Sequence, residues 1–132
     1  MIYDYLMKNY YAHYRGEIPI EPTKEQVDAV LLHHPEKIII VKDKEIRGIG
    51  VFVTLTDETY KRIELLDIKR IDVLQALALE NGNNVHFLLL CADSLRTILT
   101  GLHRVIDIHR PKTLSWWNPS FNKLHRYNLC HQ

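Results

Sequence analysis

Val85-His-Phe-Leu-Leu-Leu-Cys-Ala92 is the stretch that decides the fold, because it is a nearly continuous apolar run of strand length. An apolar run without alternation is typical of a central strand covered on both faces. Asp93 or Ser94 can then cap a helix whose apolar residues recur at helical spacing until Pro111 ends it. Lys112–Trp117 follows as another strand. The sequence therefore predicts a strand–helix–strand unit with its crossover helix on one face of a sheet.

Upstream of this unit, two segments predict an antiparallel hairpin. Lys37–Val41 is rich in β-branched residues, Asp43-Lys44 supplies a tight turn, and Glu45–Leu55 continues as a second strand. Gly48 and Gly50 lie inside that second strand, where glycine often marks a bulge or a close approach of another part of the chain. Either a bulge or a close backbone approach is therefore expected at these two glycines.

Helices are expected on either side of these strands. The aromatic residues of Tyr3–Tyr14 recur at helical spacing and lie on one face of a predicted helix, which ends at Gly16. Thr23–Gln26 forms a capping box for a second helix, which Pro35 closes. The order of elements defines a mixed α/β (α+β) domain with a central mixed sheet of about four to five strands flanked by helices. The remaining helices are expected at Thr56 to about Leu66, Asp72 to Glu80, and Asn118-Pro119-Ser120 to about Asn128.

Composition fits one globular domain covering residues 1–132. Hydrophobic residues make up 46% of the chain and charged residues 25%, so a core can form without cross-links. The longest unbroken apolar run, Phe87–Ala92, is too short to span a membrane, and polar residues interrupt the N-terminus where a secretion signal would lie. Two cysteines, Cys91 and Cys130, are too few for a disulfide framework. We therefore expect free thiols, a cytoplasmic location and no membrane partner.

Charge is distributed unevenly along the chain. The net charge is +1, but residues 103–132 carry five cations against Asp107, which gives this stretch +4 and leaves −3 for the rest. Such a stretch suits an anionic partner, either a phosphate group or nucleic acid. The alternative is a solvated face that acids elsewhere in the fold balance. The cations are Arg104, Arg110, Lys112, Lys123 and Arg126.

The start of the helix after the central strand is the position where an anion is expected to bind. Unpaired N–H groups and the helix dipole converge at such a terminus, at the carboxyl end of a strand. Ser94, Arg96 and Thr97 would add two hydroxyl groups and a cation there. The sequence therefore predicts a phosphate-binding end of the sheet.

In the order and placement of its elements, the chain from about Glu36 to Tyr127 resembles the GNAT superfamily of N-acyltransferases. In that family a hairpin leads to a central strand, and the splayed end of this strand is followed by a pyrophosphate-binding loop and helix. A further strand and a helix with a functional tyrosine complete the core. The helical insertion before Val85 is also reminiscent of toxin-activating lysine acyltransferases.

The segment that corresponds to the family's pyrophosphate loop is degenerate. The family commonly has Arg or Gln, two residues, Gly, one residue, then Gly or Ala. Here Arg96 and Gly101 match, but Leu99 stands where the first glycine belongs. The resemblance implies acetyl-CoA or another acyl-CoA as the acyl donor. The residues that it implies for donor binding are Ser94, Arg96, Thr97, Thr100, Gly101 and Asn122.

Three residues are candidates for catalytic roles, Tyr127 from the resemblance and Asp93 and His86 from their places after and near the start of the central strand. Tyr127 matches the tyrosine that protonates the departing thiolate, which a phenol can do when it is held close to the sulfur. Asp93 and His86 are candidate bases for the incoming amine, which is either a small molecule or a protein side chain. Each residue has an alternative. Tyr127 can anchor the last helix, Asp93 can cap a helix, and His86 can be a hydrogen-bonded structural histidine.

Two functions are therefore open. The first is an acyl-CoA-dependent N-acyltransferase without a metal, since no histidine or cysteine pair has structural-zinc spacing. The second is a GNAT-like binding or regulatory module without catalysis, which contacts nucleic acid through the basic C-terminal stretch and stacks bases on Trp116 or Trp117. A homodimer is compatible with both. No Gly-x-Ser-x-Gly or P-loop motif indicates a hydrolase or an NTPase.

Overall fold

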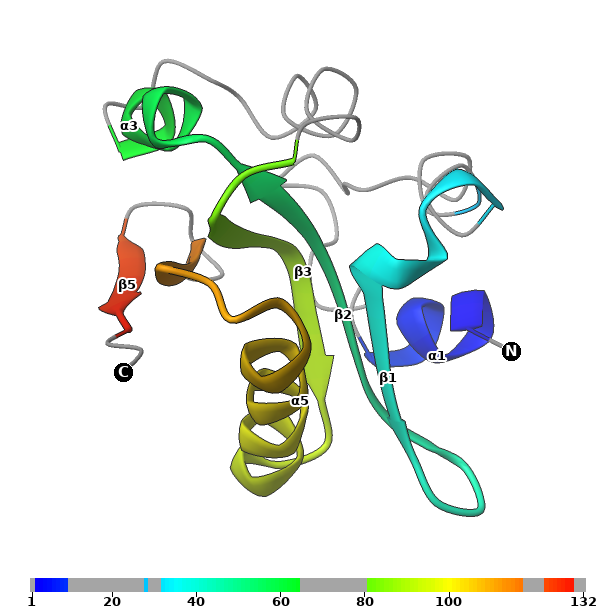
Figure 1. The fold of residues 1–132 in the computed structure, drawn as a ribbon. Coiled ribbons are helices and arrows are strands. Elements are labelled where there is room, and N and C mark those ends of the chain that lie inside the picture. The colour runs from blue at the N-terminus through cyan, green and yellow to red at the C-terminus, as the bar shows by residue number, and fades with distance from the viewer. Residues whose placement is uncertain (1, 10–27, 29–31, 65–80, 118–122, 130–132) are drawn as a thin grey trace.

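A computed structural model of the chain describes residues 2–9, 28, 32–64, 81–117 and 123–129 (Figure 1). These residues form a five-stranded mixed sheet in which strands that are neighbours in space are also neighbours in sequence. Neighbouring strands are antiparallel except the third and fourth, which are parallel. The predicted mixed α/β fold with a central sheet is confirmed. The elements are α1 (Ile2–Asn9), the 3-10 helix η2 (Pro35–Lys37), β1 (Ile38–Lys42), β2 (Ile46–Leu55), α3 (Asp57–Glu64), β3 (Asn84–Ala92), α5 (Leu95–His109), β4 (Thr113–Trp117) and β5 (Leu124–Asn128).

β3 is the central strand, as its apolar sequence predicts, and helices contribute to the core on both of its faces. On one face, Val105 of α5 packs in a cluster with Phe52 and Phe87. On the other face, Leu6 of α1 and Ile63 of α3 belong to a second cluster with residues of β2 and β3. Figure 1 shows α5 and α1 on opposite sides of β2 and β3. Burial on both faces explains why this strand lacks polar alternation.

The hairpin glycines allow side chains to approach the sheet closely. A Cβ atom added to Gly48 would lie 2.8 Å from Cγ2 of Thr97 on α5. A Cβ atom added to Gly50 would lie 2.9 Å from side-chain atoms of both Ile39 and Phe87. Both distances are shorter than ordinary van der Waals contact. Of the two alternatives expected at these glycines, the structure therefore shows a close approach, and the nearest atoms belong to side chains.

The local signals at the start of α3 and in the hairpin turn are also confirmed. Oγ1 of Thr56 accepts a hydrogen bond from the backbone N–H of Thr59 at 3.4 Å, which caps α3. In the turn, a carboxylate oxygen of Asp43 accepts from the backbone N–H of Glu45 at 3.2 Å. Cys91 is a buried free thiol, and burial raises its pKa to about 11.

The last predicted element is wrong, because residues 124–128 form the strand β5 and not the end of a helix. β5 pairs antiparallel with β4, and the ring of Trp116 stacks on those of His125 and Tyr127. Asn118-Pro119-Ser120 predicts a helix start from local signals, whereas cross-strand pairing depends on contacts that these signals do not report. That helix start itself lies outside the described residues.

Several other predictions fall outside the described part of the chain. They concern the helix end at Gly16, the capping box at Thr23–Gln26, the helix at Asp72–Glu80, Asn122 and Cys130. Within the described ranges, no helix is both long enough and apolar enough to cross a membrane.

Candidate functional site

The parallel pair β3–β4 has an unusual end. The ladder joins Asn84–Phe87 to Thr113–Trp116, and its last pair is Phe87 with Trp116. β3 continues to Ala92, so its segment Leu88–Ala92 extends beyond the ladder. Among the described residues, this segment has a strand partner on the β2 side only. We call its outer side, which faces away from β2, the β3 edge.

A bulge in β3 lies where the β3 edge begins. Phe52 of β2 pairs with Phe87, but the next residue of β2, Val51, pairs with Leu89, so Leu88 is an extra residue. Bulges bend a strand and increase its twist, and they often lie beside functional sites. Among the described residues, no strand pairs with the backbone N–H and C=O groups of the β3 edge. An unpaired edge of this kind can accept an added strand or an extended ligand.

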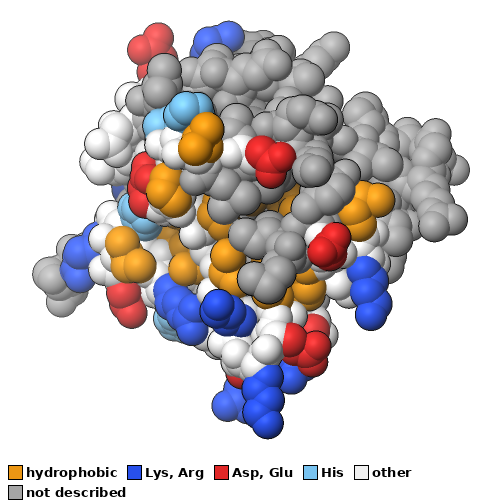
Figure 2. All heavy atoms as spheres, turned by 90° about the vertical axis from the view of Figure 1, so that its right-hand side faces the viewer, with side chains coloured by type: hydrophobic (Ala, Val, Ile, Leu, Met, Phe, Trp, Pro, Cys, Tyr) orange, Lys and Arg blue, Asp and Glu red, His pale blue; other side chains and the backbone are white. Residues whose placement is uncertain are grey.

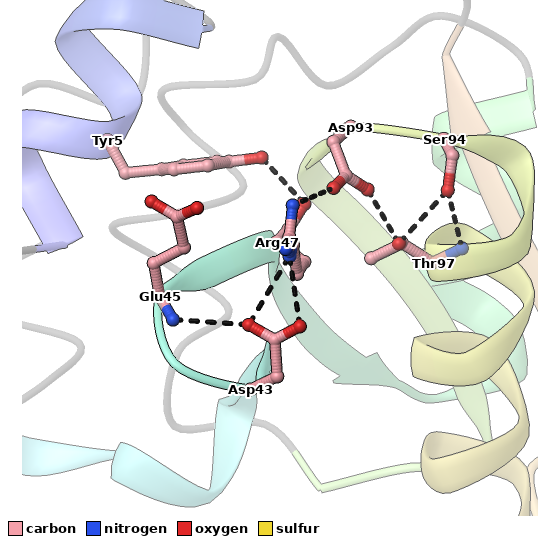
Figure 3. A network of polar contacts seen from close by, with 7 residues as sticks. All are labelled: Tyr5, Asp43, Glu45, Arg47, Asp93, Ser94 and Thr97. Atoms are coloured by element: carbon pink, nitrogen blue, oxygen red, sulfur yellow. Dashed lines mark hydrogen bonds and ion pairs between the residues drawn. The ribbon is translucent and has the colours of Figure 1, made fainter.

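The chain then turns into α5 through a closed hydrogen-bonded cap. Oγ of Ser94 accepts the backbone N–H of Thr97 at 3.2 Å, which confirms Ser94 as the N-cap (Figure 3). The Thr97 hydroxyl donates to a carboxylate oxygen of Asp93 at 2.6 Å. The hydrogen bond from Thr97 and the neighbouring Arg47 hold the pKa of the Asp93 carboxyl below its usual range. Asp93 is therefore an ionised part of the cap at neutral pH.

Arg47 ties this cap to the hairpin and to α1. Its guanidinium lies 3.4 Å from Asp93 and 3.2 Å from Asp43, so one cation bridges two carboxylates (Figure 3). The Tyr5 hydroxyl of α1 donates to the backbone carbonyl of Arg47 at 2.7 Å. Burial raises the pKa of Tyr5 to about 12, so its phenol stays protonated at neutral pH. Glu45 lies next to this network, and Figure 3 shows its carboxylate on the Tyr5 side of the turn.

An open groove of about 800 Å³ lies beside this network, between α1 and the β1–β2 hairpin. Among the described residues that line it, acidic and basic side chains are equal in number, so these residues supply no excess positive charge that would favour a phosphate group. Figure 2 shows this side of the molecule, where acidic and basic side chains are interspersed around hydrophobic ones. The acids that line the groove are Asp4, Asp43, Glu45 and Asp93, and the bases are Lys8, Lys42, Lys44 and Arg47.

The segment that corresponds to the family's pyrophosphate loop is helical. Residues 96–101 lie in the first two turns of α5, with Arg96 and Thr100 exposed. The Thr100 hydroxyl donates to the backbone carbonyl of Arg96 at 3.0 Å. Gly101 is buried, and an added Cβ atom would meet Cγ2 of Val41 at 3.5 Å, so this glycine faces the sheet. The structure therefore brings Ser94, Arg96 and Thr97 together at the start of α5 but turns Gly101 away from a ligand there.

His86 is a buried partner of a neighbouring strand. Its side chain is 1% exposed, and its Nδ1 atom lies 2.9 Å from Oγ of Ser115 on β4. Its neighbours Val85 and Phe87 contribute to the cluster under α5, so alternation directs His86 to the other face of the sheet. This arrangement favours the structural interpretation of His86.

Tyr127 lies far from the start of α5. Leu114 pairs with Tyr127 on one side and with Val85 on the other, so Tyr127 is level with the beginning of β3. Asp93 follows Val85 by eight residues, which corresponds to about 26 Å along a strand. The structure therefore does not bring together Tyr127 and Asp93, the two ends of the predicted site.

His125 is the residue near the β3 edge that the sequence did not indicate. It pairs with Trp116, the residue of β4 that also forms the last pair with Phe87. His125 is therefore level with the point where the β3 edge begins, and its side chain is half-buried. No sequence signal placed it there, because the segment was expected to be helical and its pairing with β4 was not foreseen.

Cations of the basic C-terminal stretch contact other parts of the protein. Lys112 forms an ion pair with Asp57 at 3.1 Å, and Arg104 donates to the backbone carbonyl of Ile40 at 3.1 Å. The guanidinium carbon of Arg126 lies 5.3 Å from the centre of the Tyr60 ring. These contacts leave fewer cations for an external anion than the sequence suggests.

Among the residues placed by the structure, no group of three or more histidine, cysteine, aspartate or glutamate side chains could hold a metal ion. A scan against protein-family models found no match, and a search of curated proteins found no relative of this chain.

Proposed function

We propose that the protein is an N-acyltransferase that moves an acyl group from acetyl-CoA or another acyl-CoA to an amine. The observation that carries this proposal is the β3–β4 pair, whose ladder ends at Phe87 and Trp116 while β3 continues to Ala92. A thioester that lies along the β3 edge can accept hydrogen bonds from backbone N–H groups, as an added strand would. The sequence resemblance to the GNAT superfamily agrees with this position for the donor.

The transfer needs little from the protein beyond positioning and charge stabilisation. The neutral amine attacks the thioester carbonyl carbon, so a C–N bond forms and negative charge develops on the carbonyl oxygen. Backbone N–H groups of the β3 edge are suited to stabilise this oxygen, because preorganised donors act on charge that develops in the transition state. The C–S bond then breaks, and CoA leaves as a thiolate that takes up a proton.

The donor's diphosphate fits less well than its thioester. At the start of α5, the hydroxyl groups of Ser94 and Thr97 already form the cap. The ionised Asp93 would also repel an anion there. Arg96, which is exposed in the first turn, is the cation best placed for the diphosphate. Because the pKa of Asp93 is lowered, its carboxylate is a weak base, and its role as a cap is favoured.

Titration calorimetry tests the donor. Acetyl-CoA and CoA should both bind the wild-type protein. Arg96→Glu should weaken binding about fivefold, since an exposed charge contact contributes up to about 1 kcal/mol. Arg62→Glu is the matched control, because Arg62 is also an exposed arginine. It lies on α3, which begins two residues after Leu55, and Leu55 pairs with Asn84 at the start of β3, the end opposite to α5. No binding of CoA, acetyl-CoA, octanoyl-CoA or palmitoyl-CoA would remove the proposal.

A GNAT-like binding module without catalysis is the second candidate, and the aromatic stack on β4 and β5 favours it. Trp116 on β4 stacks on both His125 and Tyr127 of β5, with interplanar angles of 26° and 28°, and Tyr127 is 54% exposed. Exposed stacked rings are the element that single-stranded nucleic acid binds. Fluorescence anisotropy with a short single-stranded DNA should then show binding that weakens steeply with salt. Binding of acyl-CoA without CoA release would also support this candidate over the enzyme.

A further inference from the structure

We propose that the β3 edge is a self-association surface, at which two copies of the chain pair their β3 strands antiparallel and cover an apolar side of α5 on each copy. This side of the helix consists of Leu95, Leu99, Leu102 and Ile106, which we call the α5 flank. Such pairing needs no acyl donor, so it is independent of the proposed transferase function.

The α5 flank is a stripe of apolar residues at helical spacing, and only one end of it is covered. Leu102 and Ile106 pack against the same buried cluster as Leu90 of β3. Towards the start of the helix the stripe opens, since Leu99 is 47% exposed and Leu95 is 70% exposed. The exposed end of the flank therefore lies where α5 follows the carboxyl end of β3.

The flank lies on the side of α5 that faces away from β1. On the β1 side of the helix, Arg104 donates to the backbone carbonyl of Ile40 at 3.1 Å. Leu99 precedes Arg104 by five residues, which corresponds to a turn of about 140° around the helix. Figure 1 shows α5 alongside the carboxyl half of β3. Because the sheet order runs from β1 through β3 to β4, the flank faces the side on which the β3–β4 ladder has ended.

The β3 edge lacks the features by which proteins prevent edge strands from pairing. Such features include charged side chains, prolines and bulges that twist a strand away. Leu88–Ala92 contains no charged residue and no proline. The bulge lies at its beginning, and Leu89–Ala92 then pairs with Gly48–Val51 in regular register. By contrast, β5 at the end of the sheet carries the exposed cation Arg126.

A second copy of the chain is the partner that fits the edge and the flank together. A strand that pairs antiparallel with its own copy creates a twofold axis perpendicular to the sheet, so each copy supplies the same donors and acceptors. The two α5 helices then lie on one face of the joined sheet, with their flanks turned towards each other. Leu95 and Leu99 carry no charge, so the facing surfaces do not repel, and removing them from water favours association.

The surface is small, so the dimer should be weak and reversible. The five residues of the β3 edge and the four of the α5 flank are far fewer than the roughly 20–30 residues that each partner contributes to a stable interface. We expect a dissociation constant of about 10–100 µM. Because the same edge carries the proposed donor site, dimer formation and donor binding would exclude each other.

Sedimentation velocity of the wild-type protein from about 5 to 500 µM, a range that spans this dissociation constant, tests the proposal. The average mass should rise from that of a monomer to that of a dimer and no further, because a twofold interface closes on itself. Leu95→Glu should weaken dimerisation about tenfold or more, since it brings a carboxylate from each copy into the contact. Ile108→Glu is the matched control, because Ile108 is also 70% exposed but follows Arg104 by four residues, on the other side of α5. It should dimerise like the wild type.

Hydrogen exchange at low and high protein concentration tests the strand pairing itself. Backbone amides of Leu88–Ala92 that point away from β2 should exchange more slowly at high concentration, because they become hydrogen-bonded in the dimer. A protein that stays monomeric over the whole range would overturn the proposal, and so would a Leu95→Glu variant that dimerises like the wild type. A dimer without added protection of these amides would show that the copies meet elsewhere, which would also overturn it.

Discussion

The two ends of β3 satisfy their polar groups in different ways. At the amino end, Asn84 is 1% exposed, and its amide donates to the backbone carbonyl of Leu55 at 3.1 Å and to Asp57 at 2.8 Å. Its side-chain oxygen accepts the Thr113 hydroxyl at 2.7 Å. At the carboxyl end, Asp93 is exposed, and its partners are side chains that water can replace.

This difference assigns a structural role to the amino end of β3, whereas the polar side chains at the carboxyl end can exchange their partners. A buried polar network is costly to break, because each remaining group loses its hydrogen bond without gaining water. Exposed ion pairs contribute little to stability, since water and salt screen them. The amino end therefore holds β2, β3 and β4 together. The exposed contacts of the carboxyl end can be exchanged at little cost in stability.

The largest effect is expected at Gly82, next to the amino end. A Cβ atom added there would overlap the backbone of Leu55 and Thr56, while the Gly82 N–H donates to the carbonyl of Thr54 at 3.1 Å. Backbone atoms cannot move aside as a flexible side chain can. Gly82→Ala should therefore lower the free energy of unfolding by about 3 kcal/mol or more. Urea unfolding measures it, and Asn81→Ala, at an exposed neighbour, should change little. Equal stability of both variants would contradict the expected overlap.

Loss of the Asn84 side chain should have the next largest effect. Asn84→Ala removes both amide donors and the acceptor of Thr113, so the carbonyl of Leu55 and the Thr113 hydroxyl lose their partners. The expected loss is about 2–3 kcal/mol, the range for unsatisfied buried polar groups. Chemical denaturation of Asn84→Ala, of Thr113→Val and of the double variant measures the coupling free energy between the two side chains. If the double variant lost the sum of the two single effects, the two side chains would not act as one network.

The strands of the amino end were predictable from sequence, because their signals are local. The apolar run at Val85–Ala92, the β-branched hairpin and the capping threonine at Thr56 each specify an element within a few residues. The close contact at Gly48 was one of two alternatives that a glycine inside a strand left open. The polar network of Asn84 was not foreseen, since it joins residues from four separate segments.

The candidate site was predictable only in part. Ser94 as the cap of α5 follows from a local pattern, and the structure confirms it. The strand β5 was missed because its identity depends on pairing with β4 and on the Trp116 stack, neither of which leaves a periodic pattern in five residues. That miss misplaced Tyr127 and hid His125. The end of the β3–β4 ladder also has no sequence signal, because strand lengths are set by tertiary pairing.

At the carboxyl end, two glycines should respond in opposite directions. Gly48→Ala would place a Cβ atom 2.8 Å from Cγ2 of Thr97 and 3.0 Å from Cβ of Ala92, and these side chains must shift. The expected loss is about 1–2 kcal/mol. Gly101→Ala meets Val41 at an ordinary 3.5 Å inside a helix, so it should stabilise the protein by about 0.5–1 kcal/mol. Thermal denaturation gives both values. Weaker acetyl-CoA binding by a fully folded Gly101→Ala would contradict its assignment to helix–sheet packing.

The smallest effect is expected from the charge of Asp93, and it should depend on pH. The pKa of Asp93 is lower in the folded protein than in the unfolded chain, so its ionisation stabilises the fold above the unfolded pKa near about 4. This contribution is lost as the pH falls through the lower, folded pKa. Asp93→Asn should therefore lower the melting temperature slightly at pH 7, and the difference from wild type should vanish in strong acid.

Asp57 provides the comparison for this last effect at the other end of β3. Hydrogen bonds from Asn84 and Lys112 also hold the pKa of Asp57 below its usual range, so it loses its contribution in the same acid window. When the pH falls, the Asp93→Asn variant should still lose the stability that Asp57 contributes. The Asp57→Asn variant should still lose the stability that Asp93 contributes. A melting-temperature difference for Asp93→Asn that is as large in strong acid as at pH 7 would mean that its carboxylate acts through packing and not through charge. The cap of α5 would then be a fixed part of the scaffold, and the contrast between the two ends of β3 would fail where a ligand is expected to bind.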